Sequence, residues 1–296
     1  MNDIPQGILP VYRTDKPNQP ICLYKGAMQL IWSRQSAKAL GDGQLCLEWL
    51  PEPRIRFEVN NSKLVGQTEG FDSISGNDGN LYLKLVEIDV SCSALILSHR
   101  PDVFDDNYFK GILTEPLERG NCEDSSYFLA HAVNFEDVIG LPVCYQKLQK
   151  NYRVTLRSKT WNITIDATPS LSSNLKRSTQ SSRGYTFTHT IKLEKVKNDF
   201  GACITDVEVC EQLEMLGYLL SLAKGSWSNA LLPVGFNPQG REVWSMRNMC
   251  KLGAYIPVCS WFSGSYTCEA LPQVFPGFIR LWDNDIWREA LRYAVT

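Results

Sequence analysis

Basic side chains between residues 146 and 183 form the first group in this chain whose types and spacing could do chemistry. This segment carries eight lysines and arginines against one acid, although the 296-residue chain has a formal net charge of only −2. Such a run can follow the phosphate backbone of a nucleic acid. The alternative is pairing with the acidic segment at 101–139, which carries nine acids and two bases. The candidate nucleic-acid contacts are Lys147, Lys150, Arg153, Arg157, Lys176, Arg177 and Arg183.

The ten cysteines offer a metal site or a nucleophile. The weak zinc candidates are Cys250, Cys259 and Cys268, which stand nine positions apart. Ligands of structural zinc sites typically have about two to four residues between them, so this set would also need a fourth ligand from elsewhere. We therefore expect no metal and no cofactor, and expect the cysteines to be small apolar residues. A cysteine nucleophile working with His131 would instead make the chain a hydrolase, but no local motif supports it.

Other residue pairs could act in acid–base chemistry. Arg183 and His189 have the spacing of the arginine–histidine motif of HEPN-type ribonucleases, in which the motif lies on a helix. Here the intervening residues are β-branched and aromatic in alternation, which predicts a strand and excludes a catalytic pair. Acid pairs such as Asp105–Asp106 and Glu136–Asp137 could bind a metal or act in acid–base chemistry, although we expect both in solvated turns.

Short strands must position most of these residues. From about residue 20 to 195, apolar and polar residues alternate in runs such as 54–59, 81–90 and 161–166, which is typical of antiparallel strands with one buried face. About eight to ten strands at this spacing predict a β-sandwich or an open barrel. The polar stretch 171–183 has five serines and is predicted to be a mobile loop.

Helical spacing begins at Thr205. This residue is a candidate N-cap, Glu208 completes a capping box, and Gly225 provides the stop signal. Residues 226–276 are rich in Trp, Pro, Gly and Cys and are predicted to be irregular, with short strands. A last helix begins near Asp283 or Asn284. The expected fold is α+β. We expect a β-rich domain at 1–204 and a second region, 205–296, that packs on it. The alternative is that the two form one continuous domain.

The overall composition, together with the search for membrane-spanning and targeting segments, limits the classes of protein to which this chain can belong. With 44% hydrophobic and 21% charged residues the chain is globular and not disordered. No apolar run is long enough to span a membrane and no targeting peptide is evident, so we expect a cytosolic protein with no membrane contact. No glycine or proline ends the last helix, which favours a native protein that continues into a further C-terminal domain.

Several motifs carry a resemblance. They are Phe128 to Phe135 (FLAHAVNF), Leu219 to Trp227 (LLSLAKGSW), Gly235-Phe236, Trp244 and a tryptophan-bearing last helix. In this order they resemble the N-terminal domains that precede HEPN ribonuclease domains in prokaryotic abortive-infection proteins of the ApeA type, over most of the chain from about residue 20. The resemblance implies a sensor that recognises a phage component and controls a C-terminal RNA-cutting domain. It carries over no catalytic residue.

We therefore predict a non-enzymatic recognition module of a cytosolic prokaryotic antiviral defence or regulatory protein. Its partner would be another protein or a C-terminal effector domain. A nucleic-acid-binding module that uses the basic segment at 146–183 is the first alternative, with contact to RNA or DNA. A hydrolase with a cysteine nucleophile is the second.

Overall fold

The computed structural model describes residues 4–33, 37–65, 81–100, 107–137, 139–146, 148–196, 203–247, 252–253 and 267–295. Two compact units account for the chain. One comprises Met1–Gln19, Gly120–Ser245 and Cys250–Thr296, and the other Pro20–Arg119 and Met246–Met249. The domain boundary predicted at 204/205 therefore falls inside the first unit. No helix among the described residues could cross a membrane.

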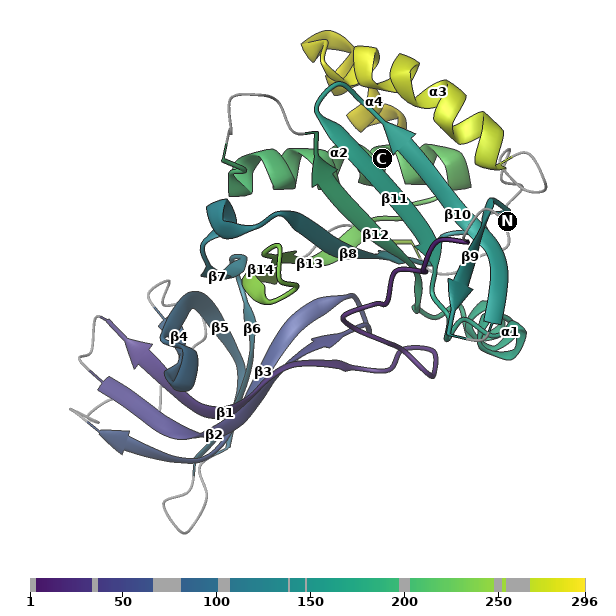
Figure 1. The fold of residues 1–296 in the computed structure, drawn as a ribbon. Coiled ribbons are helices and arrows are strands. Elements are labelled where there is room, and N and C mark those ends of the chain that lie inside the picture. The colour runs from purple at the N-terminus through teal and green to yellow at the C-terminus, as the bar shows by residue number, and fades with distance from the viewer. Residues whose placement is uncertain are drawn as a thin grey trace. The chain divides into compact units, whose positions relative to one another are not determined.

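The second unit is a closed barrel of six antiparallel strands in the order β1-β2-β3-β6-β5-β4 (Figure 1). The strands are β1 (Ile21–Trp32), β2 (Ala37–Glu48), β3 (Arg54–Val65), β4 (Leu81–Leu85), β5 (Val90–Arg100) and β6 (Asn107–Leu113), with the short 3-10 turn η2 (Val86–Ile88) after β4. Alternate residues point inward: Leu45, Leu47, Phe57 and Val59 are fully buried. Gly111 leaves room for the Phe57 ring, which a Cβ at this position would approach to 2.3 Å.

An eight-stranded sheet in the order β7-β14-β13-β8-β12-β11-β10-β9 supplies most of the first unit, and its strand pairs from β14 to β9 are antiparallel. Leu117–Arg119 of β7 and the last two residues of β14 fall within the residue ranges of the second unit. Its strands are β7 (Leu117–Gly120), β8 (Tyr127–Val133), β9 (Leu141–Tyr145), β10 (Leu148–Arg157), β11 (Trp161–Ala167), β12 (Phe187–Lys195), β13 (Ala230–Phe236) and β14 (Glu242–Arg247), with the 3-10 turn η3 (Cys122–Asp124) after β7. The predicted α+β class with mainly antiparallel strands is confirmed. The six-stranded barrel is closed, whereas an open barrel or a sandwich was expected.

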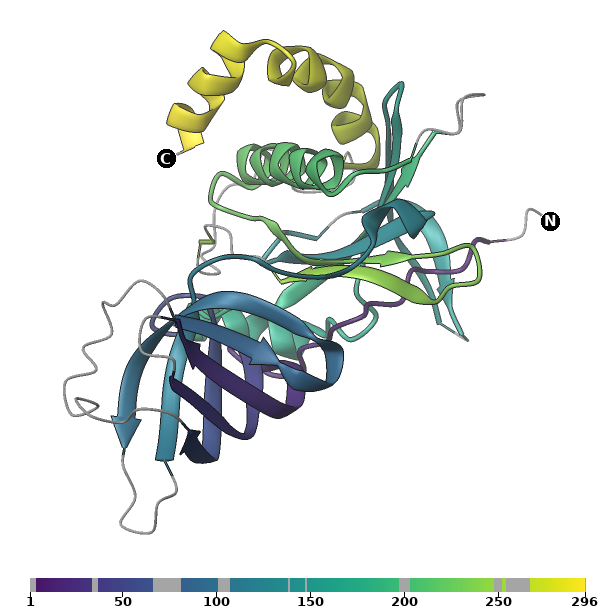
Figure 2. The same cartoon turned by 90° about the vertical axis from the view of Figure 1, so that its left-hand side faces the viewer.

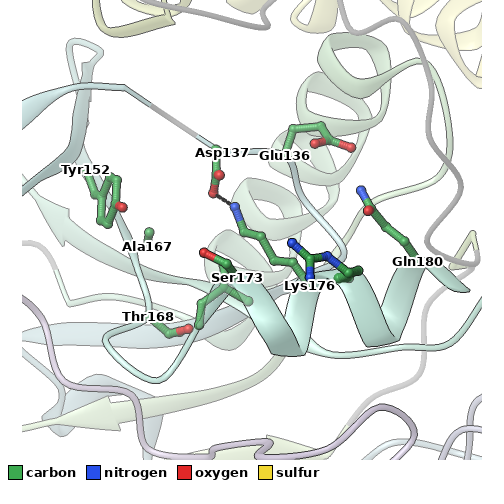
Figure 3. Close-up of a pocket in the computed structure, with 10 residues that line it drawn as sticks. Glu136, Asp137, Tyr152, Ala167, Thr168, Ser173, Lys176 and Gln180 are labelled. Carbon is green, nitrogen blue, oxygen red and sulfur yellow. Dashed lines mark ion pairs between the residues drawn. The ribbon is translucent and has the colours of Figure 1, made fainter.

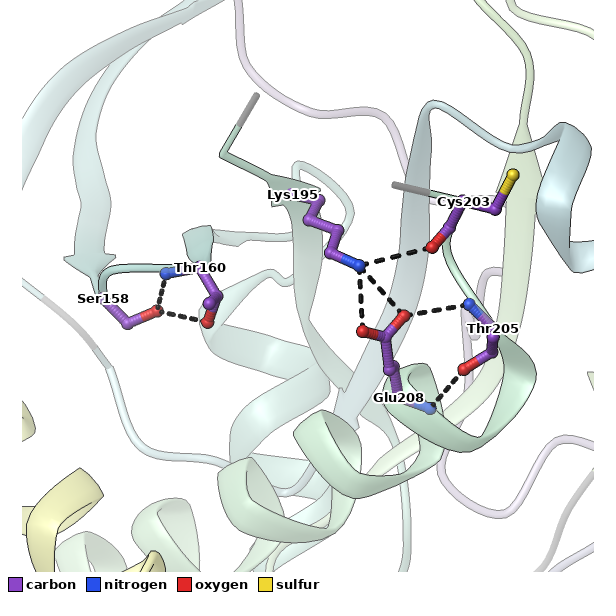
Figure 4. A network of polar contacts seen from close by, with 6 residues as sticks. All are labelled: Ser158, Thr160, Lys195, Cys203, Thr205 and Glu208. Carbon is purple, nitrogen blue, oxygen red and sulfur yellow. Dashed lines mark hydrogen bonds and ion pairs between the residues drawn. The ribbon is translucent and has the colours of Figure 1, made fainter. Parts of the chain in front are cut away.

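Four helices complete the first unit: α1 (Ser173–Ser182), α2 (Asp206–Lys224), α3 (Thr267–Trp282) and α4 (Asp285–Val295). Figure 2 shows α2 between the sheet and the pair α3 and α4; in detail, α2 contacts β13, α3 contacts β10, and α4 contacts both α2 and α3. The capping box predicted for α2 is present, since the Thr205 side chain accepts from the Glu208 N–H and Glu208 accepts from the Thr205 N–H (Figure 4). The last helix begins where expected, because Asn284 Oδ1 accepts from Ile286 N at 3.1 Å.

Two expectations were wrong. Residues 173–182 form α1 and not a loop: Ser172 caps the helix by accepting from Leu175 N at 3.1 Å, and Leu175 and Thr179 form its buried side. Helix α3 begins at Thr267, inside the stretch that was predicted to be irregular up to residue 276. Its two prolines, Pro272 and Pro276, obscured it, because proline interrupts helical hydrogen bonding.

The N-terminal strap, residues 4–19, is held on the sheet by hydrogen bonds along its length. Gly7 N donates to Cys144 O at 2.9 Å, and Asn18 N donates to Tyr185 O at 2.9 Å. Between these ends the side chains of Thr14 and Thr186 share a buried hydrogen bond of 2.7 Å. The strap is therefore a structural part of the sheet unit, although the barrel separates it from the sheet in sequence.

Candidate functional site

Arg153, one of the predicted nucleic-acid contacts, forms an ion pair with a buried acid of the protein itself. Its guanidinium forms a two-point pair with Asp166, with Nε to Oδ1 at 2.8 Å and Nη2 to Oδ2 at 2.7 Å. The Asp166 side chain is fully buried and also accepts the N–H of Ile8 in the strap at 2.8 Å. The hydrogen bonds to Asp166 raise the pKa of Arg153 above its ordinary value. Arg153 is thus a structural cation that fixes the strap to β10 and β11.

The other basic candidates are spread over several elements. Lys176 and Arg177 lie on α1, Arg183 is the left-handed C-cap of that helix, and Arg157 ends β10. Lys147 is outside the described residues, and Lys150 lies in β10 with a side chain that is not described. Strand β11 separates Arg157 from α1 by about 20 Å of extended chain, at roughly 3.3 Å per residue. The described members do not form one continuous basic track.

A charged pocket lies beside α1 and brings two of the candidates together with acidic and hydroxyl groups (Figure 3). The pocket has a volume of about 270 Å³. We call it the α1 pocket; its lining residues are Glu136, Asp137, Tyr152, Ala167, Thr168, Leu171, Ser173, Lys176, Arg177 and Gln180. They come from the segment after β8, from β10, from the end of β11 and from α1. Cations, carboxylates and hydroxyls therefore face a single small volume.

Asn134 determines where the two acids of this pocket lie. This buried residue has a φ of 54°, in the left-handed region that asparagine tolerates, and it turns the chain at the end of β8. Its side-chain oxygen accepts from Thr186 N at 3.0 Å and its Nδ2 donates to Gly184 O at 3.0 Å. Because Gly184 and Thr186 directly follow α1, these bonds hold Glu136 and Asp137 opposite that helix.

Lys176 is the central cation of the pocket. It forms an ion pair with Asp137 that Figure 3 shows as a dashed line. Partial burial lowers the pKa of Lys176, and the negative charge of Glu136 opposes this shift. The Asp137 side chain remains 54% exposed, so this pair can be reached from solvent. A bound ligand could compete for either partner of the pair.

Two more perturbed groups lie near this pocket. Burial lowers the pKa of Lys224, at the end of α2, to about 8, and Glu136 again opposes the shift. His189 is the cross-strand partner of Ala167, so its side chain points to the same face of the sheet as a residue that lines the pocket. Burial, followed by the charge of Lys176, lowers the His189 pKa to about 3. Perturbed titratable groups around a cavity are typical of functional sites.

His189 and His131 have no catalytic geometry. His189 lies in β12, as predicted, and neither of its ring nitrogens has a hydrogen-bond partner among the described residues. His131 is fully buried in β8, where its Nε2 accepts from Val11 N at 3.1 Å and from Tyr12 N at 3.0 Å. That arrangement places the ring proton on Nδ1, and burial lowers the pKa of His131 to about 3. Both imidazoles are neutral structural groups.

The cysteine candidates receive little support from the described part of the chain. No cluster of three or more potential metal ligands is found within those residues. Cys250 and Cys259 lie outside them, and the side chain of Cys268, in α3, is not described. Burial raises the pKa of the Cys92 thiol to about 11 and, together with nearby Cys22, that of Cys46 to about 12. Neither of these two thiols supplies a thiolate near neutral pH.

The sequence identified the pocket only in part. Lys176 and Arg177 were picked out by charge, and Glu136 and Asp137 were noted as an acid pair. Tyr152, Thr168 and Ser173 were missed, because single hydroxyl residues carry no sequence signal. One sequence feature could have helped to place them. Ser172 is a preferred N-cap residue, and it marks the start of the helix that forms one wall of the pocket.

Comparison with known protein families gives a match to part of the chain. Residues 121–256, slightly less than half of the chain, are similar to the family of the YopA central domain. The matched region contains β8 to β14, α1, α2 and every residue that lines the α1 pocket. No curated protein and no solved structure matches. The matched family is not the ApeA-type module that the sequence resembles, so that narrower resemblance stays a prediction.

Proposed function

We propose that this chain is a non-enzymatic recognition module that binds a charged segment of a protein partner in the α1 pocket. The observation that carries the proposal is the pairing of opposite charges and hydroxyls in one small cavity, inside the region that matches a family. A peptide offers complementary groups of both signs together with backbone donors and acceptors. About 270 Å³ suits one or two side chains and not a large apolar ligand.

The biological setting is part of the same proposal. The module would serve a cytosolic prokaryotic antiviral defence or regulatory protein and would control an effector domain. The similarity of residues 121–256 to the YopA central domain supports a phage- or defence-related family. The resemblance to sensor domains of ApeA-type proteins supports the sensor role.

The test starts from a random-peptide display selection on the full chain. Affinities of the enriched peptides are then measured by fluorescence anisotropy for the wild type, for Arg177→Glu and for the control Arg241→Glu, which changes an exposed arginine away from the pocket. We expect Arg177→Glu to weaken binding by about tenfold or more, since hydrogen bonds to charged groups contribute about 1.5–3 kcal/mol. Replacing the contacting acid of the peptide by lysine is expected to restore binding.

Two results would contradict the proposal. One is a selection that enriches no peptide above background. The other is an enriched peptide that binds Arg177→Glu as tightly as Arg241→Glu.

The nucleic-acid alternative has weaker geometric support. Arg153 is committed to Asp166, Lys176 is paired with Asp137, and Arg157 lies at the far end of β11 from α1. A loss of RNA or DNA binding between low and moderate salt that requires Arg177 and Arg183 would favour this alternative over the peptide proposal.

A further inference from the structure

A second cavity of the sheet unit, of about 630 Å³, lies apart from the α1 pocket. Three elements line it: the turn between β10 and β11, one side of α2, and the C-terminal half of α3. We call it the α3 cavity. Its basic residues are Arg157, Lys159 and Arg280, and its apolar residues include Met215, Ile279 and Trp282. A volume between about 300 and 1,000 Å³ with an apolar lining and a few polar groups is typical of small-molecule sites.

The three cations of this cavity are not neutralised within the described part of the protein. No ion pair or side-chain hydrogen bond to Arg157, Lys159 or Arg280 is found there, in contrast to Arg153 and Lys176. All three residues are exposed, and Asp283 is the single acid among the described lining residues. Three cations, from a sheet turn and from a helix, thus line one largely apolar volume together with a single acid, and none of the three is in an ion pair among the described residues.

The walls of the α3 cavity are held in place before any ligand binds. In the β10–β11 turn, Ser158 Oγ accepts from Trp161 N at 2.8 Å and from Thr160 N at 3.2 Å, a part of which Figure 4 shows. On the other side, the Trp282 ring lies 5.4 Å from Tyr218 and 6.5 Å from Phe278. A preformed site loses less conformational entropy when it binds.

We infer that the α3 cavity binds a nucleoside phosphate. The phosphate oxygens would contact Arg157, Lys159 and Arg280, since planar guanidinium groups match phosphate in two-point hydrogen bonds. The base would lie on the apolar side of the cavity, where Ile279 is half-buried and Met215 and Trp282 are buried. Three cations exceed what a single carboxylate needs, which favours a polyphosphate over a fatty acid. The separation of the basic residues into two regions favours a single nucleotide over a long nucleic acid.

The test measures binding of ATP and GTP, labelled with a fluorophore on the ribose, to the full chain. Unlabelled triphosphate and adenosine serve as competitors. We expect Arg157→Ala, Lys159→Ala and Arg280→Ala each to weaken nucleotide binding by about tenfold, and Arg241→Ala to leave it unchanged. Ile279→Ser is expected to weaken nucleotide binding while the affinity for inorganic triphosphate stays the same.

Three outcomes would overturn the inference: no saturable nucleotide binding up to millimolar concentration, binding that survives all three single substitutions, or binding of RNA or of an acidic peptide without binding of mononucleotides. The melting temperature of each variant identifies any loss of affinity that is due to unfolding. The inference is independent of the α1 pocket, and Arg177→Glu should leave nucleotide binding unchanged.

Discussion

Single residues of the strap and sheet show why charge alone is a poor guide to a binding site. Arg153 and Asp166 are cross-strand partners in β10 and β11, and their side chains pair within the protein. Arg157, four positions further along β10, points to the same face of the strand but stays exposed. From the sequence, the two arginines are equally good candidates for binding a ligand. In the structure, Arg153 pairs with a buried acid and Arg157 is accessible to solvent.

The first prediction concerns this difference. Arg153→Met leaves the buried carboxylate of Asp166 without its cation, and breaking such a pair costs about 3–5 kcal/mol. We expect a loss of this size in the free energy of unfolding from urea titration. Arg157→Met is the matched control and should change stability by less than about 0.5 kcal/mol. Equal effects of the two substitutions would show that the pair does not stabilise the fold.

At the scale of elements, the hydrogen-bond network at the start of α2 links helix and sheet. Lys195, at the end of β12, donates to both carboxylate oxygens of Glu208, at 2.8 and 3.1 Å, and to Cys203 O at 3.3 Å (Figure 4). Burial alone would raise the pKa of Glu208, but the bonds from Lys195 and Thr205 outweigh it and the pKa is lowered. The N-terminus of α2 is thereby held against the sheet.

We therefore expect Thr205→Ala to destabilise the protein by about 1 kcal/mol, because the N–H of Glu208 loses its acceptor. Thr205→Ser keeps the hydroxyl and should retain most of the stability. The measurement is the midpoint of urea unfolding for both variants. A Thr205→Ala midpoint equal to that of the wild type would contradict the role of the cap.

Elements with a clear period could be predicted from sequence, and others could not. Alternation located strands such as β11, and the capping box located α2, because these signals are local. Helix α1 has five serines or threonines among its ten residues and was missed, since its stability depends on packing of Leu175 and Thr179. Of the α1 pocket, only the charged residues could be picked out from the sequence. The hydrogen bonds of Asn134 that assemble the pocket join residues 50 positions or more apart, and such contacts leave no local pattern.

For the molecule as a whole, two fully buried neutral histidines contribute to the loss of stability in mild acid. His131 and His189 have pKa values of about 3 in the fold, against an ordinary value of 6.5. Above pH 6.5 both states are neutral and no cost arises. As the pH falls below 6.5 the unfolded chain binds protons that the folded chain excludes, so stability decreases until about pH 3.

At pH 5 each histidine should remove about 2 kcal/mol of stability relative to pH 7. The measurement compares urea unfolding at both pH values for the wild type and for His189→Leu, which should show about half of the decrease. Glu58 and Glu208 have pKa values lowered from 4.5 and lose their contribution only below that value, so pH 5 to 6.5 isolates the histidines. An unchanged pH dependence in His189→Leu would contradict this account.

The strap also determines which fragments of this protein can be produced. The sheet unit is discontinuous in sequence, because the barrel strands, from Ile21 to Leu113, lie between the strap and the sheet strands along the chain. A recombinant fragment cut at the borders of the matched region, 121–256, would remove the N–H groups that Ile8 gives to Asp166 and that Val11 and Tyr12 give to His131. A minimal version of the pocket-bearing unit therefore has to carry residues 4–19, joined by a linker in place of the barrel.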